Sequence, residues 1–108
     1  MKVGDVPLFS SRLKNERADV LARAFLSLET EEECYRLFED LFTIREVQDL
    51  AQRLEVAQLL SSKATYTEIV EKTGVSTATI GRVNRALNYG AGGYQLVMER
   101  INKEDSDE

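Results

Sequence analysis

The sequence has no histidine, no tryptophan, one cysteine and one proline among its 108 residues. Histidine is the commonest general base and the commonest metal ligand, so its absence removes most hydrolytic and metal-dependent chemistry. No nucleophile motif, phosphate-binding loop or metal-ligand spacing replaces it. We therefore predict a protein that is not an enzyme and that needs neither a metal nor a cofactor. The cysteine, Cys34, cannot form an internal disulfide, and on an apolar helical face it is expected to be a small core residue.

Long hydrophobic runs are also missing. No apolar stretch approaches the roughly 18 residues that a membrane-spanning helix needs, and no signal peptide is recognised. We expect a cytoplasmic protein with no membrane partner. A chain of 108 residues forms one domain with a limited core, which makes pairing with a second copy worth expecting.

Apolar residues recur at helical spacing, which predicts an all-α fold of about six helices, the first at 15–28 and the last around 94–101. Threonine and glutamate three residues apart have the spacing of a capping box, in which each side chain bonds the backbone N–H of the other residue. Such pairs mark three helix starts: Thr30 with Glu33, Thr43 with Glu46, and Thr65 with Glu68. Residues 1–14 are predicted to form an arm, 15–103 the helical domain, and 104–108 an acidic, disordered tail.

Residues 66–88 have the pattern of a helix-turn-helix, in which a tight turn joins two short helices. Gly74 can adopt the left-handed conformation that ends the first helix, and Ser76 is a good N-cap for the second. Val75 is expected to fill the turn. Apolar residues at i, i+3 and i+7 then form the buried side of the second helix: Ile80, Val83 and Leu87.

The other side of this second helix is small, polar and basic. Small side chains near its start let the backbone approach base edges in the major groove of DNA. The predicted contacts are Thr77, Ala78, Thr79 and Gly81 for base edges, Arg82 and Arg85 for bases or phosphates, and Lys63, Thr67 and Lys72 for phosphates. Thr79 can instead face inward and pack. An ordinary helical hairpin with solvated arginines is the plainer interpretation, but it leaves the lack of strong helix formers at this exposed helix start unexplained.

The net charge of −5, from 14 basic and 19 acidic residues, is unevenly distributed. Residues 63–88 carry four basic and two acidic side chains, a net charge of +2, which leaves −7 for the rest of the chain. A basic surface on an acidic body predicts low non-specific affinity for phosphates. Binding to DNA should then depend on specific contacts and on salt.

A resemblance to the Trp repressor superfamily is carried by two segments, FTIREVQDLAQRLEVAQLL (42–60) and TGVSTATIGRVNRAL (73–87). The fuller run ECYRLFEDLFTIREVQDLAQRLEVAQLL with STATIGRVNRALNYG looks like the Trp-repressor-related YerC/YecD group of bacterial proteins. The resemblance implies an intertwined, all-helical homodimer whose two helix-turn-helix units meet successive major grooves of double-stranded DNA. A two-fold dimer implies a palindromic operator with half-sites roughly 34 Å apart.

The resemblance also implies a pocket for an amino-acid corepressor. The matching positions are Thr43, Arg53, Arg82, Val83 and Ala86. Val83 stands where the repressor has a glycine that leaves room for an indole ring, and Ala86 replaces a serine that contacts the ligand's amino group. Displacing a packed valine costs on the order of 1–3 kcal/mol, so we expect no tryptophan corepressor. The two arginines are then expected to pair with acids such as Asp49 or Glu46, or to reach phosphate.

These observations predict a sequence-specific, homodimeric transcriptional regulator, a repressor that excludes polymerase from a palindromic operator. The alternative comes from another class of function. It is an interaction module whose helix-turn-helix surface docks on a protein partner, which the acidic balance and the sparse phosphate-binding residues favour.

Overall fold

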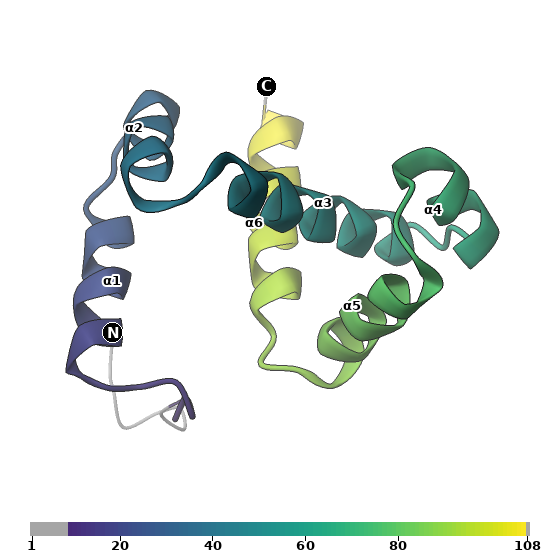
Figure 1. Cartoon of the computed structure of the whole chain (residues 1–108), viewed down its shortest axis with the longest axis horizontal. Coiled ribbons are helices and arrows are strands. Elements are labelled where there is room, and N and C mark those ends of the chain that lie inside the picture. The colour runs from purple at the N-terminus through teal and green to yellow at the C-terminus, as the bar shows by residue number, and fades with distance from the viewer. Residues whose placement is uncertain (1–8, 108) are drawn as a thin grey trace. The chain divides into compact units, whose positions relative to one another are not determined.

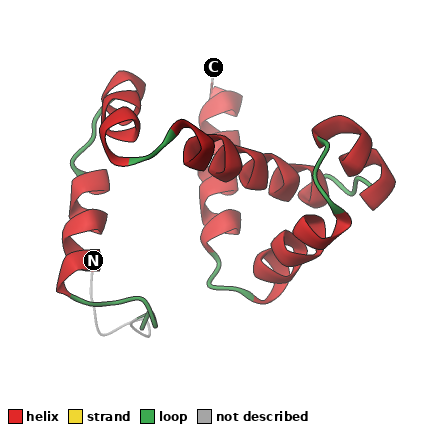
Figure 2. Ribbon diagram, viewed as in Figure 1, coloured by secondary structure: helices red, strands yellow, loops and turns green. Residues whose placement is uncertain are grey.

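The computed structural model describes residues 9–107 of the chain, with side chains described through residue 104. These residues form six α-helices, with no strand among them, and the predicted all-α fold is confirmed (Figure 1, Figure 2). The helices are α1 (Glu16–Leu26), α2 (Glu31–Leu41), α3 (Ile44–Ser61), α4 (Tyr66–Thr73), α5 (Thr77–Tyr89) and α6 (Gly93–Asp107). Of the predicted arm at 1–14, residues 1–8 lie outside the described part, and residues 9–14 precede α1 without forming a helix.

The chain divides into two compact units, one that ends at Leu41 and one that begins at Phe42. The sequence predicts a single domain at 15–103, and this division falls within it. The first unit contains α1 and α2, and neither helix has a buried residue. An amphipathic helix is stabilised mainly by burying its apolar side, and the described residues of the first unit, 9–41, contain no buried side chain that could do this for α1 and α2.

The second unit holds the core of the described chain. Its buried side chains come from α3, α4, α5, α6 and the turn between α4 and α5. They are Val56, Ala57, Ile69, Val75, Ile80, Val83, Leu87 and Met98. The three predicted apolar positions of the second motif helix are therefore confirmed as buried, and the same set includes the valine that was expected to fill the turn.

Local hydrogen bonds explain where the helices begin. The predicted capping boxes at Thr43 and Thr65 are both present at the starts of α3 and α4. At α2 only the first half of the box forms, because Thr30 Oγ1 accepts from the N–H of Glu33 at 3.1 Å. The Glu33 carboxylate instead accepts from the N–H of Glu29 at 2.8 Å, one residue before the expected partner.

The end of α3 has an unusual residue in its turn. The N–H of Ala64 donates to the carbonyl of Leu59 at 3.0 Å, and the N–H of Lys63 donates to that of Leu60 at 3.1 Å. This pair of bonds is a Schellman motif, in which glycine normally takes the left-handed position. Here Lys63 occupies it with φ +70°, a conformation that costs an ordinary side chain about 1 kcal/mol or more.

The last helix is longer than expected. The sequence predicts a disordered tail from residue 104, whereas α6 continues to Asp107. Residues 104–107 contain neither glycine nor proline, so the stretch has no residue that ends a helix by its backbone geometry. The described part of the predicted tail is therefore helical up to Asp107.

Truncating Ile80 should destabilise the second unit, because the Ile80 side chain is fully buried among helices α3 to α6. We expect Ile80→Ala to lower the free energy of unfolding by about 2–5 kcal/mol, measured by urea denaturation. The exposed Thr67 on α4 supplies the control, since Thr67→Ala should change it by no more than about 0.5 kcal/mol. Equal effects of the two substitutions would contradict this account of the core.

Candidate nucleic-acid interface

The turn between α4 and α5 has the backbone geometry that its glycine predicts. Gly74 has φ +76° and ψ 5°, in the left-handed region, and its N–H donates to the carbonyl of Val70 at 2.8 Å. A residue with a Cβ would be strained at this φ. Val75 follows with 7% of its surface exposed, so the turn is anchored in the core directly after it reverses the chain.

Side-chain hydrogen bonds hold this turn on both sides. The Thr73 hydroxyl donates to the carbonyl of Ile69 at 2.7 Å and accepts from the N–H of Val75 at 3.3 Å. Ser76 caps α5 as predicted, because its Oγ accepts from the N–H of Thr79 at 3.1 Å. The same hydroxyl lies 3.1 Å from Thr79 Oγ1 and donates to it. The side chains that surround the turn therefore fix the start of α5.

A residue of α3 also holds the turn, and the sequence gives no local signal for it. Gln52 Nε2 donates to the carbonyl of Thr73 at 3.1 Å, across 21 residues of sequence. This carbonyl belongs to the last turn of α4, where backbone acceptors lack helical partners. Gln52 is thus a positioning residue for the helix-turn-helix, and only the packing of α3 against α4 reveals it.

The exposed side of α5 contains most of the residues predicted to contact bases. Thr77, Ala78, Arg82 and Arg85 are exposed, and Gly81 is half-buried between them in sequence. Thr79 is also half-buried, and its hydroxyl accepts the bond from Ser76, so this side chain belongs to the cap of the helix. That these six residues, Thr79 included, contact DNA stays a prediction.

Three further residues were predicted to contact phosphates, and all three are exposed. Lys63 lies in the left-handed turn that follows α3, two residues before the N-cap of α4. Thr67 and Lys72 lie on α4, the first helix of the motif. In helix-turn-helix proteins the first helix crosses the DNA backbone, which is the position these residues require.

The basic side chains of α5 are available to bind an anion. Among residues 9–104, neither Arg82 nor Arg85 forms an ion pair. The ion pairs in that range are Lys14 with Asp19, Arg36 with Glu32, and Arg45 with Asp49. All three lie outside residues 63–88, so they leave the net charge of +2 in the helix-turn-helix segment unneutralised.

The acids proposed to pair with Arg53 and Arg82 have other partners. Asp49 Oδ1 lies 3.6 Å from Arg45 Nε, one helical turn away. The Glu46 carboxylate accepts from the N–H of Thr43 at 2.8 Å as part of the capping box. Among the described side chains, neither Arg53 nor Arg82 forms an ion pair with either acid. The other expectation for these two arginines, contact with phosphate, stays a prediction.

The positions implied as a corepressor pocket lie on α3 and α5 and at the N-cap of α3. Thr43 Oγ1 accepts from the N–H of Glu46 at 3.1 Å and so serves as the N-cap of α3. Arg53 lies ten residues further along the same helix, a separation of about 15 Å. On α5, Arg82 and Ala86 are exposed, whereas Val83 is only 3% exposed and belongs to the core.

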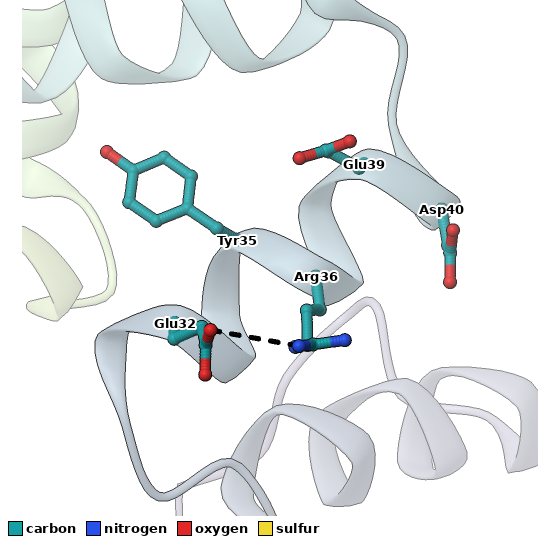
Figure 3. A pocket seen from close by; sticks show the side chains of 5 residues that line it. All are labelled: Glu32, Tyr35, Arg36, Glu39 and Asp40. Atoms are coloured by element: carbon teal, nitrogen blue, oxygen red, sulfur yellow. Dashed lines mark ion pairs between the residues drawn. The ribbon is translucent and has the colours of Figure 1, made fainter.

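A surface hollow lies elsewhere, on α2. Its lining residues are Glu32, Tyr35, Arg36, Glu39 and Asp40, and Figure 3 shows the ion pair between Glu32 and Arg36. All of them belong to one helix of the first unit, and none was predicted as a site residue. In the described part of the chain, no three His, Cys, Asp or Glu side chains are grouped so that they could hold a metal ion. No helix there has the length and apolar character to cross a membrane.

Three features of the structure together define a class of protein. They are a turn with glycine in the left-handed conformation, a capped second helix with one side in the core, and two arginines on the exposed side of that helix. This is the class of helix-turn-helix DNA-binding proteins. The chain belongs to the Trp repressor family, because the profile of the Trp repressor protein family matches residues 16–102. This is a family of DNA-binding regulators and not a family of enzymes. The resemblance indicated by the two sequence segments is confirmed.

Individual relatives agree with this assignment. The uncharacterized protein YerC of Bacillus subtilis is 48% identical over 96 residues, which are 89% of this chain and 92% of that protein. A TrpR-like protein from Eubacterium eligens has a crystal structure with a TM-score of 0.80 and 52% identity, over 84% of this chain and 94% of that chain. The crystal structure of a candidate Trp repressor from Staphylococcus aureus also has a TM-score of 0.80, with 44% identity over 84% and 91% of the two chains.

The capping box of α4 makes the stability of the first motif helix depend on pH. The backbone N–H of Thr65 donates to the Glu68 carboxylate at 2.8 Å, and this bond, with that of the Thr65 hydroxyl, lowers the pKa of Glu68 in the folded protein. A lowered folded-state pKa stabilises the fold above the unfolded-state pKa, and the stabilisation is lost as the pH falls through the folded value.

Glu68→Gln should therefore be less stable than the natural protein near neutral pH. The difference should shrink as the pH falls below the ordinary glutamate range, because a protonated Glu68 resembles glutamine. Urea denaturation of both proteins at a series of pH values measures this. A stability difference that stays constant from neutral to acidic pH would contradict the role assigned to the carboxylate.

Proposed function

We propose that this protein is a sequence-specific transcriptional regulator that binds a palindromic operator as a homodimer and represses by excluding polymerase. The observation that carries the proposal is the exposed side of α5 in a member of the Trp repressor family. That side combines small residues at its start with two arginines outside any ion pair of the described side chains. The proposed site of action is DNA in the cytoplasm.

The two ends of the exposed side have different proposed roles. Thr77 and Ala78 are small enough to let the start of α5 enter the major groove, where base edges can be distinguished. Arg82 and Arg85 lie one and two turns further along and can reach a guanine or a phosphate. The residues proposed to hold the DNA backbone are Lys63, Thr67 and Lys72.

The proposed homodimer rests on the first unit. Val20, Leu21 and Phe25 were predicted to lie on the apolar side of the first helix, and they are 57%, 46% and 41% exposed. Large apolar side chains grouped on one helical side are stabilised when another surface covers them, and a second copy supplies an identical surface. Two copies related by a two-fold axis would place their α5 helices at half-sites roughly 34 Å apart.

Control by tryptophan is not part of the proposal. Val83 is buried in the core that joins α3, α4, α5 and α6, so an indole ring at that position would have to displace packed atoms. We propose that the protein binds its operator without an amino-acid corepressor. The net charge of −5 favours the second candidate function, docking of the same surface on a protein partner.

Selection of bound duplexes from a random-sequence DNA pool, at low and at physiological salt and without added ligand, tests the proposed function. Enrichment of a palindrome with half-sites about one helical turn apart is the expected result. If no sequence is enriched at either salt concentration, the regulator proposal fails and docking on a protein becomes the better account.

Arg82→Ala should weaken binding to the selected operator by about 1–3 kcal/mol if the guanidinium reads a base, and should leave the helical content unchanged. Titration of labelled operator and of scrambled duplex gives the two affinities. Lys72→Gln is the comparison, since loss of a phosphate contact should weaken both duplexes alike and reduce the salt slope by about one. Arg36→Ala on α2 is the control for a lost arginine outside the helix-turn-helix. Unchanged operator affinity in Arg82→Ala would remove Arg82 from the interface.

Leu21→Glu should dissociate the homodimer, because it places a charge on the apolar side of α1 where the second copy is proposed to pack. Sedimentation equilibrium should give twice the mass of one chain for the natural protein and the mass of one chain for the variant. Ala22→Glu adds the same side chain at an exposed position on another side of α1 and should remain dimeric. A natural protein that sediments as a monomer would contradict the dimer proposal.

A further inference from the structure

Gly81 is a glycine that the fold does not require. Among the five glycines of the described chain, Gly74 and Gly92 have positive φ, and a Cβ on Gly90 would lie 2.3 Å from the carbonyl oxygen of Ala86. Gly93 is the first residue of α6. Gly81 lies inside α5 and has no positive φ, and a Cβ built on it meets nothing within 4 Å beyond its two chain neighbours and the backbone of its own helix. Neither backbone conformation nor packing within the described chain explains its lack of a side chain.

A glycine inside a helix weakens the helix relative to alanine. The position does not face the core, because its neighbour Ile80 and the next core residue, Val83, are buried on the other side of α5. Gly81 shares its side with Ala78 three residues before and Arg85 four residues after, and both are exposed. A glycine at such a position is typical of a place where another molecule approaches the backbone closely.

The charges next to Gly81 indicate what kind of molecule approaches the backbone of α5. Arg82 follows Gly81 directly and Arg85 lies about one helical turn after it, and neither forms an ion pair with any side chain that the structure describes. A backbone surface next to two uncompensated guanidinium groups suits a polyanion, and a helix of this kind enters the major groove of duplex DNA. This step rests on the proposed function.

The apolar surface at Gly81 and Ala78 indicates which group of the DNA it contacts. Gly81 offers its Cα and Ala78 offers a methyl group, so the surface at this point is apolar. In the major groove the one apolar group on a base edge is the 5-methyl group of thymine. We propose that Gly81 is the point at which α5 receives a thymine methyl group, and that it thereby determines one position of the operator.

The test compares Gly81→Ala with the natural protein on the selected operator and on duplexes in which single thymines are replaced by deoxyuridine, which lacks only the methyl group. For the natural protein, one such replacement in a single half-site should weaken binding about four-fold, the effect of losing one buried methyl group. Gly81→Ala should bind the thymine operator about five-fold or more weakly. The Gly81→Ala protein should no longer prefer thymine to uracil at that position, because the methyl group of the alanine occupies the space that the thymine methyl group would take.

Stability supplies an independent readout. Gly81→Ala should raise the melting temperature by a few degrees, since alanine is the better helix residue and meets no clash. Gly93→Ala is the matched control, because a Cβ there also meets nothing within 4 Å, and it should leave operator affinity and the thymine preference unchanged. Both variants should keep the oligomeric state of the natural protein.

Each other outcome overturns the inference. A lower melting temperature would show that the fold requires Gly81, and a changed oligomeric state would assign it to contact between copies. Natural affinity with a retained thymine preference, or equal weakening on thymine and uracil duplexes, would place the thymine methyl group elsewhere. If the natural protein selects no DNA sequence at all, the proposed function fails first and this inference falls with it.

Discussion

The packing of three side chains from three helices governs how this protein presents its second motif helix. Val56 of α3, Ile69 of α4 and Ile80 of α5 are the largest fully buried side chains, and each belongs to a different helix. Fully buried aliphatic groups of this size leave little freedom for the helices to slide past one another. These buried side chains thus fix the angle at which α4 and α5 cross. Gly74, in the left-handed conformation, ends α4 and lets the chain turn towards α5. The packing of this core therefore determines which side of α5 is exposed.

This arrangement explains how an acidic protein can present a surface for a polyanion. The stripe that holds α5 in place is entirely apolar, so every charge on that helix lies on the side away from the core. The acidic residues of the segment, Glu68 and Glu71, lie on α4, and Glu68 is engaged in the cap at the start of that helix. Net charge describes solubility and long-range attraction, whereas contact depends on the charges within a few ångströms.

Local rules of sequence predicted the features that depend on neighbouring residues. The caps at Thr43, Thr65 and Ser76 and the turn at Gly74 each involve residues within about four positions, so composition and spacing suffice to find them. The bond from Gln52 to the end of α4 spans 21 residues. No spacing rule reaches that far, because the contact depends on how α3 packs. The sequence gives no signal for the division between residues 41 and 42 for a related reason, since periodicity identifies an apolar side without identifying what covers it.

The two sides of α5 are therefore under different constraints. Substitution at Ile80, Val83 or Leu87 changes the volume of the core, and such changes alter the fold before they alter recognition. Substitution at the exposed positions leaves the core untouched, so the surface offered to a partner can change while the framework stays the same. Val83 falls under the first constraint, because its side chain is 3% exposed and packs in the core of the second unit. The recognition surface of α5 is thus limited to the positions that this core leaves exposed.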